Sequence, residues 1–83
     1  MNQFDEKKRK RLELQMKQIY WTGWETEKRF KSTHFNEAIQ SCDALSKKYG
    51  PAYSVRIFDV VTKERVYPFK KDKTGKEIIP NYN

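Results

Sequence analysis

The sequence predicts one small α+β domain, in which an antiparallel sheet packs on a single amphipathic helix and the elements follow in the order ββαββ along the chain. Three observations carry this prediction. Apolar residues recur at helical spacing in the middle of the chain, apolar and polar residues alternate on either side, and glycine and proline separate these segments. With 83 residues, the chain has room for one hydrophobic core.

The first regular pattern covers residues 12–20, where leucine and methionine alternate with polar residues. We predict a strand here, with a bulge after Met16 that absorbs a change of parity. The apolar residues of this segment also have helical spacing. An N-terminal helix over residues 3–18, capped by Asn2, is therefore the alternative.

A second strand is predicted over residues 24–30, after a turn at Gly23. One face of this half-exposed strand is expected to carry Trp24, Thr26, Lys28 and Phe30. In so small a domain a tryptophan is more often part of the core than of the surface, so Trp24 is expected in the core. For Trp21 the sequence favours neither a core position nor a surface position.

The clearest element is a helix over residues 33–49. Thr33 is the expected N-cap, and Gly50 and Pro51 are expected to end the helix. Steps of three and four residues place one apolar face on it, made of Phe35, Ala38, Ile39, Cys42, Leu45 and Tyr49.

Two further strands form a predicted hairpin after the helix. Residues 53–61 alternate and are rich in β-branched side chains, and after a polar turn residues 66–69 return. Pro68 indicates that the returning strand lies at an edge of the sheet. Val55 and Ile57 are expected to point toward the helix.

The two ends of the chain are more basic than its middle. Residues 1–11 form a basic N-terminal arm, residues 12–69 form the folded domain, and residues 70–83 form a basic C-terminal tail. The tail is expected to be loose, except for a turn at residues 72–75 that returns as a short strand at residues 77–79. The whole chain carries a net charge of +7 at pH 7.

Candidate catalytic residues are few. His34 is expected to be a surface imidazole at the helix start, and Cys42 a small buried hydrophobe on the apolar helix face. With one cysteine and one histidine, the chain is expected to form neither an intramolecular disulfide nor a metal site. No glycine-rich phosphate loop or other cofactor motif occurs in the sequence. A non-enzymatic protein is predicted, with a metal-free ribonuclease that uses His34 as a minor alternative.

Clustered cations favour a polyanionic partner, and we predict nucleic acid, with RNA favoured over DNA. Lysine outnumbers arginine 13 to 5, so phosphate contacts with little sequence selectivity are expected. The candidate binding residues are Lys7, Lys8, Arg9, Lys10 and Arg11 in the arm, Arg29, Lys31, Arg56 and Phe58 on the sheet face opposite the helix, and Lys63, Arg65, Lys70, Lys71, Lys73 and Lys76 toward the C-terminus. Candidates for stacking on bases or contacting a partner are Trp21, Trp24 and Tyr67.

The alternative function is that of a small protein-binding regulator. Exposed tryptophans, edge strands and charged arms also suit an inhibitor or antitoxin-like protein, of the kind that viruses make among others, acting on an enzyme that handles nucleic acid. No apolar run is long enough to span a membrane, and the N-terminus lacks an apolar signal region. A cytoplasmic protein without membrane contact is therefore expected.

Overall fold

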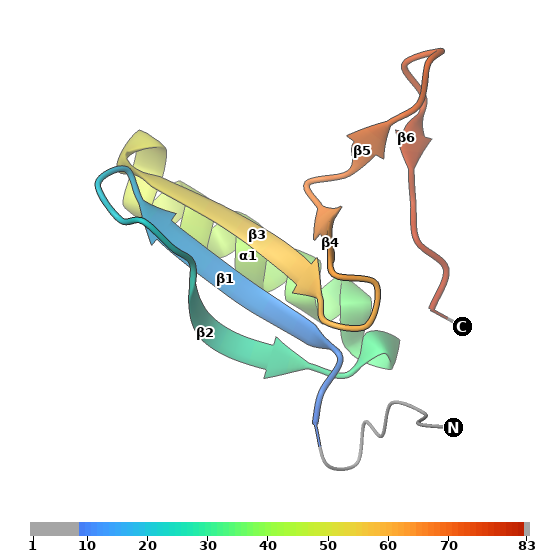
Figure 1. Ribbon diagram of the computed structural model, residues 1–83, viewed down its shortest axis with the longest axis horizontal. Helices are drawn as coiled ribbons and strands as arrows, with labels where there is room; N and C mark the ends of the chain where they lie inside the picture. The colour runs from blue at the N-terminus through green and yellow to red at the C-terminus, as the bar shows by residue number, and fades with distance from the viewer. Residues whose placement is uncertain (1–8, 83) are drawn as a thin grey trace.

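The computed structural model of this protein describes residues 9–82. The fold is α+β, as predicted: one helix packs on a four-stranded antiparallel sheet (Figure 1). The strands lie in the order β2-β1-β3-β4, and a separate two-stranded hairpin, β5-β6, follows in the chain. The elements are β1 (Leu12–Gln18), β2 (Glu25–Phe30), α1 (Phe35–Tyr49), β3 (Tyr53–Asp59), β4 (Glu64–Tyr67), β5 (Lys70–Lys71) and β6 (Glu77–Ile78).

The two central strands, β1 and β3, pair along their whole length, from Leu12 opposite Asp59 to Gln18 opposite Tyr53. The strand predicted at the start of the domain is thereby confirmed. The alternative of a helix over residues 3–18 is wrong from residue 9 onward, and residues 3–8 lie outside the described residues. This segment forms a strand and not a helix because its backbone groups bond to a strand on each side. Every second side chain of β1 then enters the core.

The irregularity in this part of the sheet lies in β2 and not after Met16. Leu14 pairs with Lys28 and Gln15 with Thr26, so Glu27 is an extra residue in β2. Even-numbered residues before and after this extra residue therefore face opposite sides of the sheet. Phe30 is buried against α1, whereas Thr26 lies opposite the outward-facing Gln15, and the expected single face of alternate residues in β2 is wrong.

The core lies between the sheet and α1. Cys42 is 2% exposed there, and burial, with repulsion from Asp43, raises the pKa of its thiol to about 11. Its predicted role as a buried hydrophobe is confirmed. Ile57 is buried and Val55 packs against the same cluster, as expected from their alternation. The buried cluster consists of Leu12, Leu14, Phe30, Phe35, Ala38, Cys42, Ile57 and Val66.

The helix begins two residues later than predicted. Residues Ser32–His34 form a short 3-10 turn, and His34 occupies the N-cap of α1 without a side-chain capping bond. The expected cap at Thr33 is wrong because the 3-10 turn uses that residue. At the other end Gly50, with φ of +65°, donates its N–H to the carbonyl of Ser46 and ends the helix as predicted.

The C-terminal segment is tied to the domain and is not a loose tail. Strand β6 confirms the short return strand expected after the turn at residues 72–75. Beyond it, the hydroxyl of Tyr82 donates to Asp59 Oδ2 at 2.8 Å, and its ring packs against Phe35 at 5.1 Å between centroids. These contacts need a partner far away in the sequence, which local composition does not reveal.

The predicted edge strand is confirmed, but β4 covers Glu64–Tyr67 and not residues 66–69, and its register shift places Val66 in the core. The chain turns away after Tyr67 and Pro68, which leaves β4 much shorter than β3 (Figure 1). Among residues 9–82, no helix combines the length and the apolarity needed to cross a lipid bilayer.

Candidate nucleic-acid interface

One face of the sheet is covered by α1, and the other carries polar and aromatic side chains. Leu12 and Leu14 of β1 face the helix, so the residues that alternate with them face away. Their pairing partners in the neighbouring strands share that side, and Trp24 joins it by contact with Lys17 and Arg56. We call this set the open face: Glu13, Gln15, Lys17, Trp24, Thr26, Arg29, Ser54, Arg56, Phe58 and Arg65.

At the centre of the open face, Arg56 contacts two aromatic rings. Its guanidinium carbon lies 4.0 Å from the ring centroid of Trp24 and 4.9 Å from that of Phe58. The ammonium of Lys17 lies 5.7 Å from the ring centroid of Trp24. Contacts of this kind are cation–π interactions. The core position expected for Trp24 is wrong: Phe30 fills the core, and the extra residue between them in β2 lets Trp24 reach the opposite side.

A chain of hydrogen bonds holds two of the three arginines of the open face, Arg29 and Arg56. Arg56 Nε donates to Gln15 Oε1 at 2.8 Å, and Gln15 Nε2 donates to Glu13 Oε1 at 3.0 Å. The other carboxylate oxygen of Glu13 accepts from Arg29 Nε at 3.2 Å and from Arg9 Nη2 at 3.5 Å. Gln15 uses both ends of its amide, so its orientation is set by its neighbours. The guanidinium groups of Arg29 and Arg56 are thereby held in place before any ligand arrives.

Glu13 is the one carboxylate of the open face, and it is used internally. Its side chain is 9% exposed. Burial alone would raise its pKa, but hydrogen bonds from Arg29, Gln15 and Arg9 outweigh burial and lower it. The pKa of Arg56 is lowered by burial and by repulsion from Arg65, although an arginine remains charged at neutral pH. Four cationic side chains against one carboxylate leave the open face positive.

Positive charge continues around the edge of the sheet beside β2. A shallow pocket there is lined by Arg9, Lys10, Lys28 and Arg29. The ammonium of Lys28 lies 5.1 Å from the ring centroid of Phe30, which holds its stem against the domain. The described end of the N-terminal arm therefore extends the open face.

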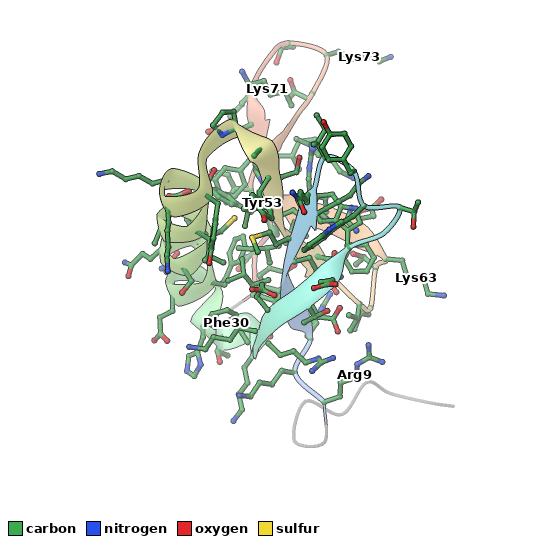
Figure 2. The ribbon with its side chains drawn as sticks, turned by 90° about the vertical axis from the view of Figure 1, so that its left-hand side faces the viewer. Arg9, Phe30, Tyr53, Lys63, Lys71 and Lys73 are labelled. Atoms are coloured by element: carbon green, nitrogen blue, oxygen red, sulfur yellow. The ribbon has the colours of Figure 1, made fainter. Side chains whose placement is uncertain are left out.

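The other predicted cations are spread over the molecule. Figure 2 shows Lys71 and Lys73 at one end and Arg9 at the opposite end, so these cations of the two basic segments do not lie on one surface. Lys70 lies 3.9 Å from Glu64. Outside the open face lie Lys31, in the link to α1, Lys63, in the β3–β4 turn, and Lys76, in the β5–β6 turn, while Lys7 and Lys8 fall outside the described residues.

Arg11, predicted as part of the basic arm, is instead engaged within the fold. Its Nε donates to the buried carboxylate of Asp59 at 3.0 Å. Its guanidinium carbon lies 5.1 Å from the ring centroid of Tyr82. We therefore do not include Arg11 in the interface.

Two of the three candidate stacking residues lie on the helix side. The ring of Trp21 packs edge-on against Tyr53 at 5.9 Å, and Tyr53 in turn contacts Tyr49 of α1. The hydroxyl of Tyr67 donates to Asp43 Oδ1 of α1 at 2.7 Å, which raises the pKa of Tyr67 to about 12. Trp21 also lines a pocket with Trp24 in the β1–β2 turn.

Sequence reasoning missed several residues of the interface. Lys17, Glu13 and Gln15 were within reach, because the alternation that turns the leucines of β1 inward turns these three residues outward. Lys28 lines the pocket beside β2, and it also lies next to the extra residue of that strand, which no local signal marks.

Neither candidate for acid–base or nucleophilic chemistry belongs to the open face. His34 is exposed at the start of α1, and Cys42 is buried on the side of that helix that faces the core. Comparison of the chain with protein-family models, with curated proteins and with solved structures finds no match. The geometry of the open face is therefore the basis for a functional proposal.

Proposed function

We propose that this protein binds single-stranded nucleic acid, RNA in preference to DNA, on the open face of its sheet, as a non-enzymatic module of the cytoplasm. The observation that carries the proposal is the contact of Arg56 with two half-buried rings, Trp24 and Phe58, at the centre of a positive face. Rings of this kind stack on unpaired bases, and the surrounding cations neutralise phosphates.

A single strand fits this surface better than a duplex. Stacking requires access to the flat face of a base, which a duplex covers by its own base stacking. An aromatic side chain contributes about 1–3 kcal/mol for each base that it stacks. Trp24 and Phe58 flank one guanidinium, so they offer adjacent stacking positions with a positive charge between them.

The lysine excess of the whole chain does not extend to the open face, where three of the four cations are arginines. The Nε–H groups of Arg29 and Arg56 are used within the protein. Their remaining N–H donors suit phosphate oxygens. Contacts of this kind hold the backbone of the ligand and read little of its sequence.

The test is fluorescence anisotropy with a labelled oligouridylate and the matching oligothymidylate, each at a low and a high salt concentration. Wild-type protein is expected to bind both, oligouridylate more tightly, and to lose affinity as salt rises. A double variant, K17Q/R65Q, removes two charges from the open face. It is expected to lower the salt slope by about 1 to 1.5 units, since each lost phosphate contact removes about 0.7.

The matched control is the double variant K71Q/K73Q, which removes two charges from the β5–β6 hairpin at the far end from Arg9 (Figure 2). It is expected to bind like the wild type. Equal losses in the two variants would mean that net charge, and not the open face, determines binding. No salt-sensitive association with either oligonucleotide would contradict the proposal as a whole.

A further inference from the structure

Strand β3 is longer than its outer neighbour. It pairs with β1 from Tyr53 to Asp59. On its other side, β4 pairs only with residues 57–59 of β3, and the chain then turns away (Figure 1). Within the described residues, no strand pairs with the outer edge of residues 53–56. The backbone groups on this edge of β3 therefore have no partner strand within the described residues.

The direction of the backbone groups at this edge follows from two hydrogen bonds at the ends of the β1–β3 pair. Ile19 N–H donates to the carbonyl of Ala52, and Val60 N–H donates to that of Arg11. Even-numbered residues of β3 therefore bond to β1, and odd-numbered residues direct their N–H and C=O groups away from it. Tyr53 uses its N–H within the preceding turn, on Gly50. The outer edge thus offers the carbonyl of Tyr53 and both backbone groups of Val55.

The open edge lies in a groove of about 380 Å³. Ser46 of α1 lines it on the helix side, and Arg56 and Arg65 line it on the open-face side. A strand added here would alternate its side chains between these two sides, because successive residues of a strand point in opposite directions. The groove therefore accepts a polypeptide in extended form.

The two arginines that line the groove favour a negatively charged polypeptide. Arg65 lies near enough to Arg56 for the repulsion between them, after the effect of burial, to lower the pKa of Arg56. A strand with aspartate or glutamate at its open-face positions would neutralise both guanidinium groups. A second copy of this chain, with its net charge of +7, would add positive charge instead. Nucleic acid has no amide backbone to pair with Val55.

We propose that the outer edge of β3 at residues 53–56 docks an extended acidic segment of a partner protein, which adds a strand to the sheet beside Val55. This inference goes beyond nucleic-acid binding and does not depend on it. The partner would bond to Val55 through its backbone and to Arg56 and Arg65 through its carboxylates.

The test is amide hydrogen exchange measured by NMR on the whole protein. Val55 N–H is expected to exchange faster than Ile57 N–H in the free protein, because it lacks a partner strand. A short peptide of alternating glutamate and threonine, blocked at both ends, is expected to slow the exchange of Val55 N–H by about tenfold at saturation. It is also expected to shift the amide signals of Ser46 and Arg65.

Two matched peptides separate the contributions. Methylating alternate peptide nitrogens on the side that faces β3 removes the N–H donors of the peptide and places methyl groups against the edge, so the added strand cannot approach. Replacing glutamate with lysine reverses the charge. Neither peptide is expected to slow exchange at Val55. The variant V55P removes the outward N–H of residue 55, and it also replaces a side chain that packs against the core. It is expected to lose the acidic peptide while keeping its association with oligouridylate, which distinguishes this site from the open face.

Three results would overturn the proposal. The first is unchanged exchange at Val55 at every concentration of the acidic peptide. The second is equal protection by oligouridylate, which would make nucleic acid the occupant. The third is a Val55 N–H already protected in free protein that sediments as a dimer, which would make a second copy the occupant. The peptide comparisons keep the test valid if V55P does not fold.

Discussion

The Nε–H group of Arg11 donates to both carboxylate oxygens of Asp59, at 3.0 Å from each. The side chain of Asp59 is 1% exposed. The same carboxylate accepts bonds from the hydroxyl of Tyr82 and from the backbone N–H groups of Val61 and Thr62. One buried acid therefore joins the start of β1, the β3–β4 turn and the C-terminal segment, which are distant in sequence.

Replacing Asp59 with asparagine is expected to destabilise the protein by about 3 kcal/mol, because Arg11 loses its ion pair and the turn loses acceptors. Urea unfolding followed by circular dichroism measures the change. The control is Glu37→Gln, which removes a carboxylate from an exposed position of α1. An unfolding midpoint for Asp59→Asn equal to that of the control would show that the buried pair contributes nothing.

Acid is expected to weaken the fold. Burial alone would raise the pKa of Asp59, but the bonds from Arg11, Tyr82 and two backbone amides outweigh burial and lower it. A carboxyl with a lowered pKa contributes stability that is present above its unfolded pKa and is lost as pH falls through its folded pKa. The free energy of unfolding should therefore be constant down to about pH 5 and fall below about pH 4. Urea titrations across this range test the expectation.

The variant Asp59→Asn serves as the control for that titration. It should lose part of the acid dependence and keep the part that comes from Glu13, whose pKa is also lowered. Stability that increases on acidification would mean that these carboxyls are not held in the way described.

Cys42 is expected to resist modification in the folded protein. Its thiol is buried, and its pKa is raised to about 11, so little thiolate is present at pH 8. An aromatic disulfide reagent should react at least about a hundredfold more slowly with native protein than with protein in urea. The released chromophore gives the rate. Equal rates would place the thiol at the surface.

The two aromatic rings of the open face are expected to contribute directly to oligouridylate binding. Replacing Phe58 with alanine should weaken binding by about 1–3 kcal/mol, the range for one stacked base. A Trp21→Phe variant keeps Trp24 as its one tryptophan, and the tryptophan emission of this variant should be quenched by the oligonucleotide. Anisotropy and emission titrations measure these effects. Unchanged affinity for Phe58→Ala would remove stacking from the proposed function.

The sequence predicts those features of the fold that depend on neighbours in the chain. Gly50 ends α1 because its positive φ suits glycine, and Val55 and Ile57 face the helix because they alternate. The extra residue at Glu27 depends on how β2 aligns with β1, which no local pattern records, and the side taken by Trp24 depends on that alignment.

The candidate site was predicted only in part, because local patterns place some of its residues and long-range contacts place the others. Arg56 and Phe58 follow from the alternation of β3 and do lie on the open face. Arg11 appeared to be one more cation in a basic run, because its partner Asp59 lies 48 residues away. A binding role read from a row of charges therefore requires the long-range contacts of each member.

The shared carboxylate of Asp59 also brings two remote parts of the chain together. The guanidinium of Arg11 lies over the ring of Tyr82, with 5.1 Å between the guanidinium carbon and the ring centroid. Truncation before Tyr82 would therefore deprive Asp59 of a hydroxyl donor and Arg11 of its aromatic neighbour at the same time.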